Sequence, residues 1–435
     1  MTIKTRIITL IQKTYSGIFK KRMTLEMNTF IESMFFVFIA TGIAKSLTLI
    51  MNYFGGRILG PGLYGEYTLI ISVAAFLVIP IGLGILGGIT KTLAETQSYS
   101  RQRKIVSTAS IYLIGTLIVM TAIYLIFYKQ IANAIHIGNN LFILAILFAL
   151  VNVGASLIGS ILLGLHKQKT WAYMTAISNL IAFCIFIIAV LSINNSLLII
   201  YVPTSVAFFL FSIIGFLLLK KYIFPLKFNR PIFKETFNYG IYHFFIIIAN
   251  TVLGNVDKVM LGFMIDAVSV GLYQAYYLSS IMIMGVLSGV FVQVFFPTAV
   301  KLQDKKGILK KINKMIPLTI ITTLVLTAIF EYVGVKYLYN YEFFLSTASI
   351  FVITTIATTV FVIYTTFLSS FGVAGVKKTA IIVFLGMFLN ILLNYMLIPK
   401  FQINGAAIAT LISYVLMCVA SILLVNKHTK IYKLT

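Results

Sequence analysis

Three ionisable residues of this 435-residue chain lie inside long apolar stretches, where a charge is unfavourable. They are Lys45, Asp257 and Lys258. On insertion scales, a charged side chain at the middle of a membrane helix costs about 2.5 to 3.5 kcal/mol, so it normally faces a partner or a water-filled cavity. These residues are therefore the first candidates for binding or ion chemistry.

Polar residues accompany the three charges at the spacing of a helix face. The first set is Thr41, Lys45, Thr48 and Asn52, and the second is Asn250, Gly254 and Asp257 with Lys258 beside it. Residues at i, i+4, i+7 and i+11 share one face of a helix, so each set predicts a polar stripe on an otherwise apolar helix. Two such stripes predict a polar seam where two groups of helices meet.

A structural interpretation and a functional one remain open for this seam. In the structural interpretation, Lys45 pairs with Asp257 across the seam, and Lys258 extends toward the outer interface as long amphipathic side chains do. Arg57 lies at a helix end, where a plain interfacial position is also expected. A second acidic residue near an outer helix end, Glu331, is expected to be solvated.

In the functional interpretation, the seam binds an anionic headgroup. The expected headgroup contacts are Lys45, Lys258, Arg57, Asn52 and Asn250. Asp257 then balances the positive charge or binds a coupling ion, either a proton or sodium. No other cofactor is expected.

The elements that position these residues are apolar runs. The sequence contains about twelve runs of roughly 20 residues, the length that crosses a hydrocarbon core as a helix. The candidate spans are 29–53, 67–89, 105–128, 141–163, 171–191, 197–219, 239–264, 271–296, 316–337, 343–370, 379–399 and 405–425. They predict an all-α polytopic membrane protein.

Basic residues gather in alternate connections between the spans. One set of connections, together with both terminal tails, holds most of the 34 lysines and arginines. The other set holds only Arg57, Lys129, Lys336 and Lys400. Because basic residues accumulate in cytoplasmic loops, this asymmetry predicts a multi-pass protein of the cell membrane with both termini in the cytoplasm.

The formal net charge of +24 does not indicate nucleic-acid binding in this chain. It is divided among short loops on one face, where anionic lipid headgroups are expected to meet it. A nucleic-acid partner is therefore not expected.

The most basic central connection, 220–234, divides the spans into six and six. The expected organisation is a basic amphipathic cytoplasmic tail at 1–28, an N-terminal lobe at 29–222, a linker at 223–238, a C-terminal lobe at 239–426 and a tail at 427–435. Because six is even, both lobes begin on the same side of the membrane and are expected to be parallel repeats. The segment 58–67 is echoed by 260–273, at the same place in each lobe.

Metal and enzyme chemistry have little support in the sequence. Cys184 and Cys418 lie inside apolar spans, and the four histidines are scattered, so no metal-ligand spacing is present. The chain has only ten acidic residues, and no pair of them falls in an outer loop. A membrane glycosyltransferase or glycan polymerase, which needs paired carboxylates or an acidic metal motif, is therefore the weaker alternative.

Three stretches carry a resemblance to a known family. They are GRILGP at 56–61 with YGEY at 64–67, VDKVMLG at 256–262 with VGLY at 270–273, and NYMLIPK at 394–400 with INGAAIAT at 403–410. The chain resembles the oligosaccharide flippase (polysaccharide biosynthesis) family over about residues 29–425. That family belongs to the multidrug/oligosaccharidyl-lipid/polysaccharide exporter superfamily, which also contains multidrug extruders and lipid II flippases.

The resemblance implies a fold and a cargo. It implies two six-helix lobes of the multidrug-extruder (MATE) type around a central cavity that opens alternately to either side. It implies a transporter, not an enzyme, that moves a polyprenyl-diphosphate-linked oligosaccharide to the outer leaflet. Its expected partners are this lipid-linked sugar, anionic lipids and other polysaccharide-assembly membrane proteins, and the chain itself is expected to be a monomer.

A multidrug or organic cation exporter of the same fold is the nearest alternative. Such a site usually gathers carboxylates to attract cations, whereas the stripes here contain more lysine than aspartate. A lipid II flippase is a further relative, but those proteins commonly carry additional spans. A membrane scaffold without transport is disfavoured by the charges inside the spans.

Overall fold

The computed structural model describes residues 25–285, 288 and 304–431. Within these ranges ten helices are long and apolar enough to cross a membrane, and each predicted span coincides with one of them over most of its described residues. The chain is therefore a multi-pass membrane protein with an all-helical transmembrane part. The predicted tail at 1–28 lies largely outside the described residues, as do the end of the span at 271–296 and part of the tail at 427–435.

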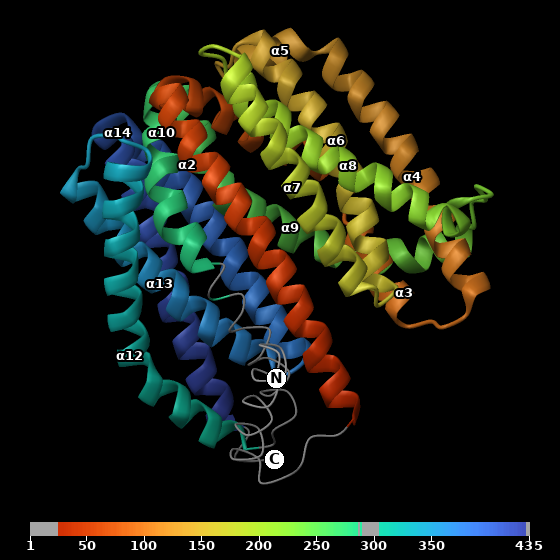
Figure 1. The fold of residues 1–435 in the computed structure, drawn as a ribbon. Coiled ribbons are helices and arrows are strands. Elements are labelled where there is room, and N and C mark those ends of the chain that lie inside the picture. Colours follow the sequence, from red (N-terminus) through yellow and green to blue (C-terminus); the bar gives the residue numbers. More distant parts are fainter. Residues whose placement is uncertain (1–24, 286–287, 289–303, 432–435) are drawn as a thin grey trace, which may run out of the picture.

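The helices form two groups. The N-terminal lobe consists of α2 (Leu25–Gly82), α3 (Ile85–Ala94), α4 (Tyr99–Ile126), α5 (Tyr128–Ala134), α6 (Asn139–Gly164), α7 (Gln168–Ser192) and α8 (Leu198–Ile223). The C-terminal lobe consists of α9 (Arg230–Met264), α10 (Ala267–Tyr277), the π-helical turn η1 (Leu278–Met282), α12 (Lys305–Glu331), the π-helical turn η2 (Tyr332–Leu338), α13 (Leu345–Ser369) and α14 (Val373–Ile431). In Figure 1, α4 to α8 lie at the right and α10, α12, α13 and α14 at the left, with α2 beside α10 and α9 near the middle.

Two of the ten helices are bent in the middle and each holds two of the predicted spans. In α2 the bend is at Gly60, with φ 70° and ψ 171°. Only glycine adopts this conformation readily, and Pro61 also disfavours a helical residue before it. In α14 the bend is at Gln402, with φ 50° and ψ −126°. With these bends, the ten helices accommodate the twelve spans expected from the sequence.

The second predicted span is itself interrupted. After Pro80, helix α2 ends at Gly82, and the chain passes through Leu83 and Gly84 with φ of 38° and 77°. It continues as the short helix α3. Proline removes one backbone hydrogen bond from a helix, which makes a break close to it inexpensive. Residues on α3 thereby leave the direction of α2 and face a different set of neighbours.

The lobes touch through a backbone contact between α2 and α10. A Cβ atom on Gly65 would overlap the carbonyl oxygen of Ala267, and a Cβ atom on Gly271 would overlap that of Pro61. Small residues let helices approach closely inside a membrane, where apolar side chains gain little by leaving lipid. The two glycines belong to the segments that echo each other in sequence, and the structure places these segments in contact.

The basic connection after α8 is attached to the N-terminal lobe. The amide of Lys227 donates to Ser107 Oγ at 2.6 Å, and the amide of Asn229 donates to Thr108 Oγ1 at 3.1 Å. Asn229 in turn caps α9 by accepting from the amide of Ile232 at 3.1 Å. The first turns of α9 are thus fixed against the N-terminal lobe before the helix enters the C-terminal lobe.

We call the side that carries the lysine-rich connections the basic face, and the other side the opposite face. Helix α5 lies at the top of Figure 1 on the opposite face, and α3 lies low in the same view, toward the basic face.

If the basic face is cytoplasmic, as its charge predicts, a cysteine at Lys377 will be protected from a membrane-impermeant maleimide in intact cells. A cysteine at Lys129 will react. Both substitutions are made after Cys184→Ser and Cys418→Ser, and the reverse labelling pattern would contradict the predicted orientation.

The contact at Gly65 is expected to tolerate no side chain. Gly65→Ala overpacks the junction of α2 and α10, and we expect it to lower stability by about 1 to 3 kcal/mol in thermal or denaturant unfolding. Gly115→Ala on α4 is the control, because a Cβ atom there meets nothing within 4 Å. That change is expected to leave stability equal or slightly higher, since alanine favours helix by up to about 1 kcal/mol over glycine. Equal unfolding of both variants would show that the close contact is not important for stability.

Candidate functional site

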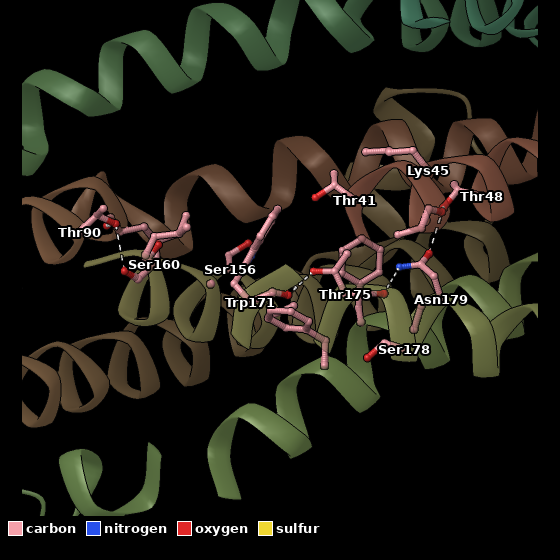
Figure 2. A pocket seen from close by; sticks show the side chains of 18 of the residues that line it. Thr41, Lys45, Thr48, Thr90, Ser156, Ser160, Trp171, Thr175, Ser178 and Asn179 are labelled. Carbon is pink, nitrogen blue, oxygen red and sulfur yellow. Dashed lines mark hydrogen bonds between the residues drawn. The ribbon is translucent and has the colours of Figure 1, made fainter. Parts of the chain in front are cut away.

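A cavity of about 870 Å³ lies among the helices of the N-terminal lobe. Its walls come from α2, α3, α6, α7 and α8, and α9 adds Tyr239 and Ile247. The volume falls within the range of about 300 to 1,000 Å³ that is usual for ligand pockets. Figure 2 shows Lys45, Thr48 and Asn179 together at one end of this cavity and Thr90 and Ser160 at the other.

Hydroxyl and amide groups are spread along the cavity wall. Thr48 Oγ1 donates to Asn179 Oδ1 at 3.0 Å, and Asn179 Nδ2 donates to the carbonyl of Thr175 at 2.8 Å. These bonds hold the Asn179 amide in a fixed orientation between α2 and α7. The hydroxyl oxygens of Thr41 and Ser178, by contrast, are buried without a hydrogen-bond partner in the described part of the chain. Buried polar groups are normally paired, so these two are available to a ligand or water.

The charges that line the cavity are positive. Lys45 and Lys91 are among the lining residues, and no aspartate or glutamate is. The ammonium of Lys91 pairs with Glu95 at 3.1 Å and lies 4.6 Å from the centre of the Tyr239 ring. The ammonium of Lys45 has no hydrogen bond or ion pair within the described ranges. Lys45 therefore contributes an uncompensated positive charge to a largely apolar cavity with a few polar groups.

The cavity extends to the basic face. Its lining includes Ala94 at the end of α3, Leu163 near the end of α6 and Trp171 near the start of α7. All three lie next to basic connections. Trp171 is the chain's single tryptophan, and it stands between the two polar ends of the cavity in Figure 2.

On the opposite face the lobes are joined by a group of buried tyrosines, which we call the tyrosine cluster: Tyr53, Tyr64, Tyr339 and Tyr341. Tyr64 and Tyr339 share a hydrogen bond of 2.8 Å between their hydroxyls, and Tyr341 donates to the carbonyl of Gly56 at 2.7 Å. Tyr53 donates to Ser279 Oγ at 3.2 Å. These bonds join α2 to the C-terminal lobe, so the lobes are in contact on the opposite face.

Two predicted headgroup residues belong to this closed side. Asn52 Oδ1 accepts from the Tyr64 hydroxyl at 3.1 Å, and its amide donates to the carbonyl of Thr48 at 2.8 Å. Arg57 is exposed and donates to the carbonyl of Tyr337 at 3.3 Å. Neither side chain lines the cavity. The polar stripe of α2 therefore lines the cavity with Thr41, Lys45 and Thr48. Its last residue, Asn52, lies beyond the cavity and bonds to Tyr64 at the contact between the lobes.

The stripe on α9 does not line the cavity either. Asn250 is exposed, and Lys258 is buried within the C-terminal lobe. The ammonium of Lys258 donates to the carbonyl of Gly254 at 2.8 Å and lies 4.1 Å from the centre of the Tyr277 ring. The predicted seam formed equally by both stripes is therefore wrong for this conformation. Only the α2 stripe faces the cavity, and a headgroup role for Asn250 or Lys258 stays a prediction.

Asp257 is buried at the centre of a polar group inside the C-terminal lobe. One carboxylate oxygen accepts from the hydroxyls of Tyr273 and Thr410 at 2.5 and 2.7 Å. The other accepts from Asn394 Nδ2 at 2.6 Å. Asn394 also donates to Asn390 Oδ1 at 3.1 Å, while its own amide oxygen is buried without a partner among the described residues.

This arrangement contradicts the expected pair of Lys45 with Asp257. Both residues are described, and no ion pair joins them. The charge of Asp257 is instead stabilised by three hydrogen-bond donors from α10 and α14, and hydrogen bonds to a charged group favour its ionised form. Lys45 and Asp257 consequently lie in different sites, one in each lobe.

Sequence reasoning did not find several cavity residues. Lys91, Trp171 and Asn179 line the cavity, but each looks ordinary in the sequence, as a loop-proximal lysine, a helix-end tryptophan and a lone amide. Their convergence depends on how α3 and α7 pack against α2. The one sequence signal that sets any of them apart is that Trp171 is the chain's single tryptophan.

Comparison with known proteins agrees with this architecture. The family model described as polysaccharide biosynthesis protein matches residues 30–303. An uncharacterised membrane protein of Methanocaldococcus jannaschii is 27% identical over 314 residues, which is 66% of this chain. The match spans 60% of that relative's length.

Solved structures share the fold at low sequence identity. An inward-facing multidrug resistance MATE family transporter of the MOP superfamily aligns with a TM-score of 0.65 and 12% identity, covering 92% of this chain and 99% of that one. The lipid II flippase MurJ in an inward closed conformation aligns at 0.55 and 19% identity, covering 89% and 87%. An outward-facing MATE transporter aligns at 0.54 and 13% identity, covering 92% and 96%. The chain thus shares the fold of these transporters and of this flippase.

Proposed function

Because the chain belongs to the polysaccharide biosynthesis protein family, we propose that it is a flippase for a polyprenyl-diphosphate-linked oligosaccharide. In this proposal it carries the lipid-linked sugar from the cytoplasmic to the outer leaflet by alternating access, for the assembly of a cell-surface glycan. The family and the MOP-superfamily fold together favour transport over catalysis.

The observation that carries the proposal is the lining of the cavity, which contains two lysines, several hydroxyl groups, the amide of Asn179 and, among the described side chains, no carboxylate. A site for organic cations would be expected to present negative charge. This cavity presents positive charge from Lys45 and unpaired hydroxyls from Thr41 and Ser178. It therefore suits a diphosphate with attached sugar better than a cationic drug.

The positions of the groups suggest how the headgroup is held. With the basic face in the cytoplasm, the headgroup enters between α3, α6 and α7 while the lipid tail stays in hydrocarbon. Lys45 then replaces part of the hydration that the phosphates lose, and charge-assisted hydrogen bonds of this kind are the strong ones. The amide of Asn179 and the hydroxyls of Thr41 and Ser178 are available to sugar hydroxyls. Outward release requires the tyrosine cluster to separate.

Two sources of driving force are compatible with this arrangement. An interior-negative potential favours outward movement of an anion by about 2.3 kcal/mol per charge per 100 mV. The second source is a coupling ion at Asp257. Its carboxylate, the oxygens of Asn390 and Thr410 and the unpartnered oxygen of Asn394 form a set of oxygen ligands, which hard cations prefer. Because three donors stabilise the ionised form, we favour sodium over a proton there.

Removing the charge of Lys45 is expected to weaken headgroup binding. Trp171, as the single tryptophan, reports occupancy of the cavity by its fluorescence. We expect a short-chain polyprenyl diphosphate disaccharide to change this emission and Lys45→Gln to raise its dissociation constant by about 10-fold or more, since hydrogen bonds to charged groups contribute about 1.5 to 3 kcal/mol. Flipping of a labelled analogue in proteoliposomes should fall in parallel.

Lys129→Gln on the opposite face is the matched control and should change neither measurement. A disaccharide without diphosphate should bind weakly to both proteins. Equal affinity and transport by wild type and Lys45→Gln would remove Lys45 from the site. Tight binding of cationic dyes with no response to the diphosphate probe would favour the drug-exporter alternative.

A sodium site at Asp257 predicts a specific effect of the ion on stability. A ligand that binds only the folded protein stabilises it, by about 2.7 kcal/mol at 100 times its dissociation constant. We expect sodium chloride to raise the unfolding temperature relative to choline chloride at equal ionic strength, and Asp257→Asn to abolish the difference. Asp266→Asn removes an exposed acid that caps α10 and should keep the sodium effect despite a lower baseline. An undiminished sodium effect in Asp257→Asn would exclude this site.

A further inference from the structure

Glu331 is the last residue of α12 and immediately precedes η2. Its side chain is 0% exposed, and neither carboxylate oxygen has a hydrogen-bond partner of normal geometry among the described residues. The hydroxyl of Ser280 lies beside it but donates to the carbonyl of Tyr276 at 2.6 Å. The expectation that Glu331 is solvated is therefore wrong, because the surrounding helices cover it. It is unlike Asp257, whose oxygens are all engaged.

Helix α12 packs against η1, η2 and α13, and η2 also packs against α10 and α2. Among the described residues of these elements, no cation pairs with the Glu331 carboxyl group. The ionisable residues at this end of those elements and in the loop that follows η2 are Tyr276, Tyr53, Arg57, Tyr332, Lys336, Tyr337, Tyr339, Tyr341 and Glu342. The guanidinium of Arg57 is exposed and contacts the carbonyl of Tyr337. The ammonium of Lys336 is also exposed and contacts the Tyr332 hydroxyl at 3.3 Å.

An ionised carboxylate in such a place is strongly unfavourable. A buried charge without an ion pair or hydrogen bond loses its hydration energy with no compensating interaction, so the carboxylate takes up a proton instead. We propose that Glu331 is a proton-binding site, distinct from the ion site at Asp257, which holds its proton while the lobes are closed on the opposite face and releases it when they part.

The neighbouring turns connect this site to the tyrosine cluster. Glu331 lies next to η2, and η2 packs against η1 at Gly334 and Ser279, where a Cβ atom on Gly334 would overlap Ser279 Oγ and lie 3.2 Å from a Tyr53 ring carbon. Ser279 is the residue that accepts from Tyr53 of α2. π-Helical turns are rare and occur often at functional sites. Here the turns η1 and η2 lie between Glu331 and α2 of the N-terminal lobe.

Separation of the lobes breaks this packing. Once Tyr53 and Tyr64 of α2 separate from Ser279 and Tyr339, water reaches the end of η2, and hydration stabilises the carboxylate form of Glu331. By linkage, the protonated form then favours the closed opposite face, and the ionised form favours the open one. The inference concerns the C-terminal lobe and its contact with α2, so it stands whatever cargo the cavity carries.

Infrared spectroscopy of the full-length protein in lipid nanodiscs tests the protonation directly. A protonated carboxylic acid has a carbonyl stretching band that a carboxylate lacks. We expect this band in the wild type at neutral pH and its loss in Glu331→Gln, which preserves the size and neutrality of the side chain. Glu342→Gln, at an exposed acid on the following loop, should retain the band. Persistence of the band in Glu331→Gln, or its absence from the wild type, would overturn the proposal.

Distance measurement tests the coupling independently and keeps the proposal testable if Glu331→Gln fails to fold. Spin labels are placed at Gln130→Cys and Leu345→Cys, which are exposed on α5 and α13, in a Cys184→Ser, Cys418→Ser background. We expect a longer distance to become populated in the wild type as pH rises, and Glu331→Gln to keep the short distance throughout. Asp257→Asn should still respond to pH. A distance that does not change with pH in the wild type, or the same pH response in Glu331→Gln, would refute the coupling.

Discussion

The close backbone contact between α2 and α10 is the constraint on which the rest of the conformation depends. Gly65 and Gly271 have no Cβ atoms, and the carbonyls of Ala267 and Pro61 occupy the space that those atoms would fill. In a membrane, such contact supplies van der Waals packing that apolar side chains alone cannot, because lipid is as apolar as leucine. It brings the tyrosines of α2 against those of the loop after η2, and the lobes close on that side.

Closure on one face explains the position of the cavity. The cavity is bounded by α2 and extends toward the ends of α3, α6 and α7 on the basic face. Inside it the hydroxyls of Thr41 and Ser178 have no protein partner, whereas Thr48 and Asn179 bond to each other. Polar groups left unpaired inside a membrane protein are unfavourable unless water or a ligand satisfies them. The cavity is thus built for a polar occupant.

The two lobes divide the charges between them. The N-terminal lobe holds the positive cavity, and the C-terminal lobe holds two buried acids in opposite environments. Asp257 accepts hydrogen bonds at both oxygens, which stabilises its negative charge, while Glu331 receives none. This difference is the basis for proposing a different ion at each carboxyl group. Both acids belong to the lobe that contacts α2 through the tyrosine cluster, so their states bear on the same closure.

The sequence by itself determined the membrane class and the positions of most spans, and it singled out Lys45 and Asp257 as charges inside spans. These follow from local properties: the length of apolar runs, the alternation of basic loops and the cost of a charge inside a span. It also identified the repeated segments that carry Gly65 and Gly271.

Only the tertiary structure decided which polar residues meet. Asn52 was expected in the headgroup site but bonds to Tyr64, because α2 passes from the cavity to the contact between lobes along a single face. Lys258 is buried in the C-terminal lobe and does not line the cavity. Trp171 and Asn179 of α7 do line it. Glu331 is buried next to η2. The physical reason is that spacing along one helix fixes which residues share a face, while the neighbour of that face depends on contacts far apart in the chain.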